Sequence, residues 1–152
     1  MDVVLHRSDV AVAIDGPLAI SSLAAQLTVE AVDAMFEATT VHRARYGGGG
    51  SISITLVKPN VPVPDDATRA HIRRVNLRPD VARTSYVVID APGFWAATMR
   101  GIVAGISLVS PQAPRGAGSV REVLVQVERR LLGRDLDALE REILAFRRRH
   151  VG

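Results

Sequence analysis

The chain has 152 residues, of which 47% are hydrophobic and 23% charged, the composition of one globular domain with a single core. Its 19 basic side chains outnumber the 16 acidic ones only slightly, and all but Lys58 are arginine, so the charge is no nucleic-acid footprint. The absence of cysteine excludes disulfides, thiolate metal sites and cysteine nucleophiles. These values exclude a disordered chain, a collagen-like fibre and a disulfide-stapled miniprotein, and they indicate no function.

The N-terminus and the hydropathy predict a cytoplasmic protein. Residues 1–9 lack the cationic lead and the long apolar run of a secretory signal. No segment reaches the ~18 apolar residues that a membrane span needs. The most apolar segment, residues 94–109, is interrupted by Arg100.

The first third of the chain predicts a hairpin and a helix. Apolar residues indicate a short strand at 3–5 and an alternating strand at 10–14, which Asp15, Gly16 and Pro17 end in a turn. A helix then begins at the N-cap Thr28, carries apolar residues three and four apart, and ends at the glycines 47–50.

The middle of the chain predicts strands separated by helices. The strand at 52–56 places large apolar side chains on one face and Ser53 and Thr55 on the other. A proline-rich loop leads to a helix opened by Asp65 and Asp66. A continuous apolar strand at 85–89 is typical of burial on both faces.

The helix predicted at 94–109 is apolar nearly all round and must therefore be covered. Small residues spaced by four, namely Ala97, Gly101 and Gly105, favour close packing of this helix on its own sheet. Either a C-terminal helix of the same chain or a second subunit would cover the apolar surface of this helix. A homodimer is therefore one of the two alternatives that we expect. Residues 110–118 form a loop with room for a short edge strand.

Two helices are predicted after this loop. Ser119 and Glu122 make a capping box, Gly133 breaks the first helix, and Asp135 caps the second. The second carries an apolar stripe that is a candidate interaction surface, formed by Leu136, Leu139, Ile143 and Phe146. We therefore divide the chain into an α/β domain at 1–132 and a helical extension with a basic tail at 133–152.

This order predicts an α/β fold with a single mixed, mostly parallel sheet of about four to five strands. An N-terminal hairpin supplies the antiparallel part, helices pack on the sheet, and an extra helix follows at the C-terminus.

The order of elements resembles the SpoIIAA-like branch of the STAS domains, the fold of bacterial anti-sigma-factor antagonists. The resemblance spans residues 1–132 and is carried by residues 10–17, 52–59, 65–75, 85–95 and 119–132. It implies a non-enzymatic regulatory module that docks onto a protein partner. The antagonists carry a phosphorylatable Ser or Thr where residues 58–66 stand here, and this chain has no hydroxyl there before Thr68. Asp65 and Asp66 could at most mimic a permanent negative charge.

The alternative function is the binding of a small anionic or amphipathic ligand. If the main strands are parallel, their carboxyl ends meet at one edge, where open α/β sheets bind ligands. That edge would collect a candidate site of Asp15, Lys58, Asn60, Asp90, Gly93, Phe94 and Trp95. The competing interpretation, which we favour, makes the aspartates turn and cap residues and Lys58 a solvated counterion. A ligand pocket would contain Trp95, whereas an interaction module would show it packed.

Other chemistry finds little support in the sequence. The four histidines are far apart without ligand-like spacing, so we expect no metal site. No nucleophile elbow or serine–histidine–aspartate set is recognisable, so we assign no catalytic residue and no cofactor. Aromatic residues make up only 4% and do not interleave the arginines of residues 69–78, which argues against nucleic-acid binding.

Overall fold

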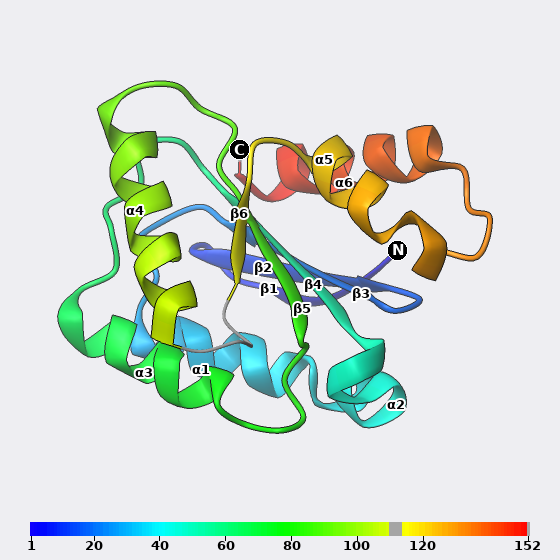
Figure 1. The fold of residues 1–152 in the computed structure, drawn as a ribbon, viewed down its shortest axis with the longest axis horizontal. Coiled ribbons are helices and arrows are strands. Elements are labelled where there is room, and N and C mark those ends of the chain that lie inside the picture. The colour runs from blue at the N-terminus through cyan, green and yellow to red at the C-terminus, as the bar shows by residue number, and fades with distance from the viewer. Residues whose placement is uncertain (110–113, 152) are drawn as a thin grey trace.

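The computed structural model describes residues 1–109 and 114–151, and its centre is a six-stranded sheet with the sequential order β1-β2-β3-β4-β5-β6 (Figure 1). The hairpin strands β1, β2 and β3 pair antiparallel, and β3 to β6 pair parallel. The mixed, mostly parallel sheet is thus confirmed, with more strands than expected. The strands are Asp2–His6, Val10–Asp15, Leu18–Leu23, Ile52–Val57, Thr84–Val88 and Arg115–Ala117.

Helices cover both faces of this sheet (Figure 1). On one side lie α1 (Val29–Ala38), α2 (Thr40–Gly50), α3 (Asp66–Asn76) and α4 (Phe94–Val109), and on the other α5 (Val120–Val127) and α6 (Leu136–Val151). Within residues 1–109 and 114–151, no helix is long and apolar enough to cross a membrane.

The sequential strand order explains this division of the helices. Each parallel connection from β3 onward steps to the next strand in the same direction. Because such crossovers are right-handed, all their helices fall on one face of the sheet. The opposite face would face water without α5 and α6, which follow the last strand.

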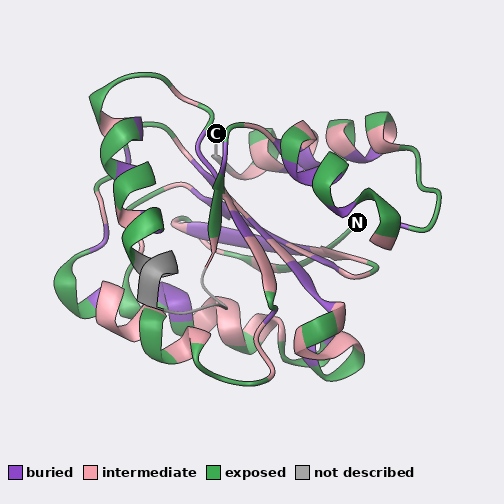
Figure 2. Ribbon diagram, in the orientation of Figure 1, coloured by how far each residue is buried: buried purple, intermediate pink, exposed green. Residues whose placement is uncertain are grey.

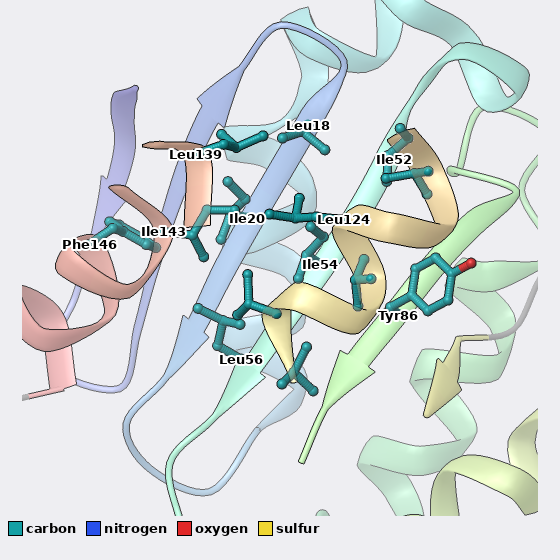
Figure 3. Close-up of a cluster of buried hydrophobic side chains, with 14 of the residues drawn as sticks. Leu18, Ile20, Ile52, Ile54, Leu56, Tyr86, Leu124, Leu139, Ile143 and Phe146 are labelled. Atoms are coloured by element: carbon teal, nitrogen blue, oxygen red, sulfur yellow. The ribbon is translucent and has the colours of Figure 1, made fainter. Parts of the chain in front are cut away.

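The largest core lies under α5 and α6 and is made of long aliphatic side chains (Figure 3). The sheet contributes Leu18, Ile20, Ile52, Ile54, Leu56, Tyr86 and Val88, and the helices contribute Val123, Leu124, Leu139, Ile143 and Phe146. The buried surfaces of α5 and α6 face the sheet (Figure 2). The segment after residue 132 is therefore part of the central core, and α6 folds back on the sheet.

Several sequence signals are confirmed at the helix starts. The side chains of Thr28, Asp65 and Ser119 accept hydrogen bonds from the backbone N–H three residues on. Glu122 reaches back to the start of the helix as in a capping box, and it accepts from the N–H of Gly118, one residue before the N-cap, at 2.7 Å.

One strand, β3, and one helix break were not predicted. In the expected 110–118 loop, which left room for a short edge strand, residues 115–117 form the edge strand β6, while 110–113 lie outside the described residues. The helix expected from Thr28 to the glycines is two helices, α1 and α2. The Thr39 hydroxyl donates to the carbonyls of Met35 and Phe36, and such bonds compete with continued helix at this point.

The small-residue stripe of α4 faces away from the sheet, contrary to expectation. Ala97, Gly101 and Gly105 are exposed, and a Cβ added to either glycine would meet no atom within 4 Å. The residues that pack inward are Ala96, Met99 and Val103.

Removing one core side chain of α6 should destabilise the protein strongly. Phe146 is 1% exposed, so Phe146→Ala should lower the free energy of unfolding by about 3–5 kcal/mol in urea denaturation. Phe94 is 89% exposed, and Phe94→Ala should change it by less than about 0.5 kcal/mol. Equal effects of the two substitutions would contradict the placement of α6.

The glycine run ending α2 offers a second stability test. A Cβ at Gly48 would lie 2.6 Å from the Pro79 carbonyl oxygen and 2.9 Å from that of Val81, whereas at Gly49 it would meet nothing within 4 Å. Gly48→Ala should therefore lower the unfolding free energy by about 1–3 kcal/mol because backbone must move. Gly49→Ala should be neutral or stabilising by a few tenths of a kcal/mol, since it restricts the unfolded chain. A neutral Gly48→Ala would show that this close approach is absent.

Candidate ligand-binding pocket

A pocket of about 230 Å³ lies between the sheet and the helices α1, α3 and α4. It is larger than the ~150 Å³ cavity that holds a benzene molecule in a protein core, and smaller than pockets for drug-sized ligands. It therefore suits a small organic molecule.

The floor of the pocket is formed by small and hydroxyl side chains of three neighbouring parallel strands. Ser53 of β4 pairs with Ala19 of β3 and Ser85 of β5, and the next floor position, Thr55, pairs with Ser21 of β3. Successive side chains of a strand point to opposite faces, so these residues alternate with the long aliphatic side chains of the main core. The same strands fill one face of the sheet and leave the other underfilled.

The roof of the pocket is apolar. It is made of side chains from α1, α3 and α4 and the segment before α1, namely Leu27, Val32, Met35, Phe36, Ile72, Val75, Met99, Ile102 and Val103. Two of these are methionines, whose flexible side chains adapt to irregular space.

Polar groups gather at the end of the pocket where β4 begins. His42 and Arg43 of α2, Ser51 before β4 and Asn76 at the end of α3 line this end. The far end, where β3 and β4 finish, is lined by Leu23, Val57, Leu27, Pro64 and Met99. The pocket is thus polar at one end and apolar at the other.

His42 is buried at 4% exposure and joins three segments at the polar end. Its Nε2 lies 3.0 Å from the Gly16 carbonyl oxygen, and its Nδ1 lies 3.3 Å from the Ser51 hydroxyl. Because a carbonyl only accepts, Nε2 carries the proton of the neutral ring and Nδ1 accepts from Ser51. Burial lowers the pKa of His42 below its ordinary value, aided by the charges of Arg43 and Arg45 and opposed by the bond to Gly16.

Arg43 is a buried cation at the same end, with 9% of its surface exposed. Its Nε donates to the Asp80 carboxylate at 3.3 Å, and its guanidinium stacks 3.4 Å from the centre of the Phe36 ring. Nη1 donates to the carbonyl of Phe36 and the hydroxyl of Thr39. Burial lowers the pKa of Arg43, and the Asp80 carboxylate opposes that effect.

The strand-end site expected from sequence is not assembled as one cluster. Asp15 ends β2, which runs antiparallel to β3, so it lies beside Leu18 and the starts of β4 and β5. Lys58 and Asp90 follow the opposite ends of these strands. The expectation assumed that the strand ending at Asp15 runs parallel to the others.

The two aspartates instead hold α6. Asp15 binds Arg134, just before α6, with two hydrogen bonds of 2.7 and 2.9 Å. Asp90 binds Arg147 with bonds of 2.6 and 3.1 Å, and Arg147 also donates to the Val57 carbonyl at 3.1 Å. The helix is therefore fastened at both ends of the sheet.

The remaining expected residues lie outside the pocket. Asn60 and Gly93 occupy turns with positive φ, and Phe94 is almost fully exposed. Trp95 packs against the second core cluster, and its Nε1 donates to the Val61 carbonyl at 2.6 Å. A packed Trp95 is the arrangement expected of an interaction module. Because Trp95 does not line the pocket found here, its fluorescence is not a direct probe of that pocket.

The stripe considered as an interaction surface is also accounted for within the chain. Leu139, Ile143 and Phe146 are at most 1% exposed, and Leu136 packs against the same core. These side chains are not accessible to a partner in this structure.

Sequence reasoning missed the pocket because β3 was not recognised. The signal that could have revealed it is the alternation of residues 18–23, which places Ala19 and Ser21 on the same face as Ser53 and Thr55. Among the described residues, no group of three histidine, aspartate or glutamate side chains could hold a metal ion.

Two histidines with lowered pKa values, His42 and His150, should make stability depend on pH. The pKa of His42 is lowered from 6.5, and burial likewise lowers that of His150, with help from His6 and Arg149. Below pH 6.5 the unfolded state binds protons that the folded state does not, so the unfolding free energy should fall as pH falls.

Unfolding in urea between pH 7.5 and 5 would measure this slope. His42→Gln should flatten it by at most one proton, about 1.4 kcal/mol per pH unit, and His150→Gln should flatten it further. Ser51→Ala keeps the burial of the ring and should keep the slope. An unchanged slope in the His42 variant would show that its ring is not desolvated.

Comparisons of this chain with known proteins found no match. No family model matches the chain, and no curated protein or solved structure matches it. The resemblance to the STAS domains therefore remains a prediction from the order of elements, and the α/β fold rests on the sheet and helices described above.

Proposed function

We propose that the protein binds a small amphipathic molecule in the pocket between the sheet and helices α1, α3 and α4. The observation that supports this proposal is the pairing of a hydroxyl floor with an apolar roof around about 230 Å³ of space. This keeps the ligand-binding function considered from the sequence and moves it to a different site.

The energetic argument concerns the cost of leaving this space empty. The apolar roof side chains lack van der Waals partners on the side that faces this space. A ligand that supplies these contacts would stabilise the protein.

Water satisfies only part of the pocket surface. A buried water needs two to four polar partners, which the floor hydroxyls of Ser21, Ser53, Thr55 and Ser85 can supply. The roof side chains offer none. A molecule with polar atoms along one side and hydrocarbon on the other fits both surfaces.

Filling the pocket from its floor should abolish binding. The neutral dye N-phenyl-1-naphthylamine, titrated into the protein, should gain fluorescence on binding. Ser53→Leu should weaken its binding at least tenfold because the leucine occupies the space. Ser85→Val is a smaller filling that should act in the same direction if Ser53→Leu fails to fold.

The matched control is Ser8→Leu, which adds the same side chain at an exposed position. It should leave dye binding unchanged. Absence of dye binding to the wild-type chain, or equal binding to the filled variants, would reject the pocket as a ligand site.

A further inference from the structure

We propose, building on the ligand-binding function above, that the ligand is an alkyl carboxylate whose carboxylate lies at the Arg43 and Asn76 end of the pocket. Its hydrocarbon chain would run along β4 toward Leu27 and Pro64. Four observations support this orientation and this class of ligand.

The charge of the lining residues favours an anion. The lining includes the guanidinium-bearing Arg43 and the imidazole of His42, and none of the described residues that line the pocket is an aspartate or glutamate. The nearest acidic partner of Arg43 is Asp80, whose side chain is 40% exposed and outside the lining. Asp80 also pairs with Arg78, so one carboxylate faces two guanidinium groups. In a water-poor environment the remaining positive charge attracts a carboxylate more strongly than it does in water.

Arg43 also has donor capacity left for such a group. Its Nη1 and Nε are used by Phe36, Thr39 and Asp80. Its Nη2 carries two N–H bonds and donates to the Thr40 hydroxyl at 3.5 Å, the outer limit for a hydrogen bond. A carboxylate oxygen would be a stronger acceptor for Nη2.

Asn76 supplies a second donor at the same end. Its Nδ2 is buried and has no hydrogen-bond partner among the described residues. Leaving a buried amide N–H unpaired is unfavourable, so an acceptor brought to it by a ligand would stabilise the complex. Asn76 closes α3, and Asp80 in the connection that follows contacts Arg43, so both donors belong to one corner of the pocket.

The apolar chain has a matching path. Every second residue from Ser51 to Val57 lines the floor of the pocket. At ~3.3 Å per residue, this row of floor positions is roughly 20 Å long. Along this path the lining changes from polar to aliphatic. A molecule with one charged end and a hydrocarbon chain follows the same change.

The test uses three octyl compounds with one tail and different heads to displace N-phenyl-1-naphthylamine from the wild-type protein. Octanoate should displace the dye at a concentration at least tenfold lower than octanol, and octylamine should be the weakest. Equal displacement by all three would overturn the carboxylate inference and leave the proposed function intact. Dye binding that none of them reverses would also overturn it, since the tail would then not fit.

The variant Asn76→Leu, similar in shape and without donors, should weaken octanoate about tenfold and leave octanol unchanged. Asn76→Asp places a negative charge at the same position and should reverse the preference toward octylamine. These substitutions avoid Arg43, whose contacts with α1 also support the fold. An octanoate affinity that neither Asn76 variant changes would show that the carboxylate does not lie at this end.

Discussion

The structure depends on the way three parallel strands divide their side chains between two faces. On β3, β4 and β5 the long aliphatic residues point toward α5 and α6, while alanine, serine and threonine point mainly toward the crossover helices. Because side chains alternate strictly along a strand, the two faces cannot be chosen independently once the register is set. A densely packed core on one side and a pocket on the other follow from a single pattern.

The sequential order of the strands determines which helices meet which face. Right-handed crossovers place α1, α3 and α4 over the hydroxyl face. The aliphatic face is covered by α5 and α6. Figure 1 shows the resulting separation, with α5 and α6 on the side opposite the pocket. The largest core and the proposed ligand pocket therefore lie on different faces of one sheet.

Much of the fold follows from local sequence patterns. The caps at Thr28, Asp65 and Ser119 have short polar side chains at the start of apolar periodicity, and this signal is independent of the rest of the molecule. The strand at 52–57 and the helices after residue 119 are predictable for the same reason. The sheet class follows from their order.

The candidate site could not be predicted in the same way. Asp15 and Asp90 have the residue types of a ligand site, yet their partners Arg134 and Arg147 are distant in sequence and no local pattern identifies them. The direction of β2 relative to the parallel strands can be recognised only once β3 is known. The alternation of apolar and polar residues in β3 is short and is interrupted by two adjacent serines. The pocket arises because small side chains lie next to each other on one face of three strands. This arrangement can be recognised only when the register of the strands is known.

The attachment of α6 has a consequence for the order in which the protein is made. Asp15 is 119 residues away from its partner Arg134, and Leu18 and Ile20 next to it pack under a helix at the end of the chain. A ribosome adding ~5–20 residues per second exposes those early strands for many seconds before α6 emerges. The pocket is lined by residues before 115, whereas the aliphatic face is covered only after α6 has been made. The nascent chain thus carries this aliphatic surface uncovered until residues 136–151 have emerged, and its need for chaperones should be greatest before then.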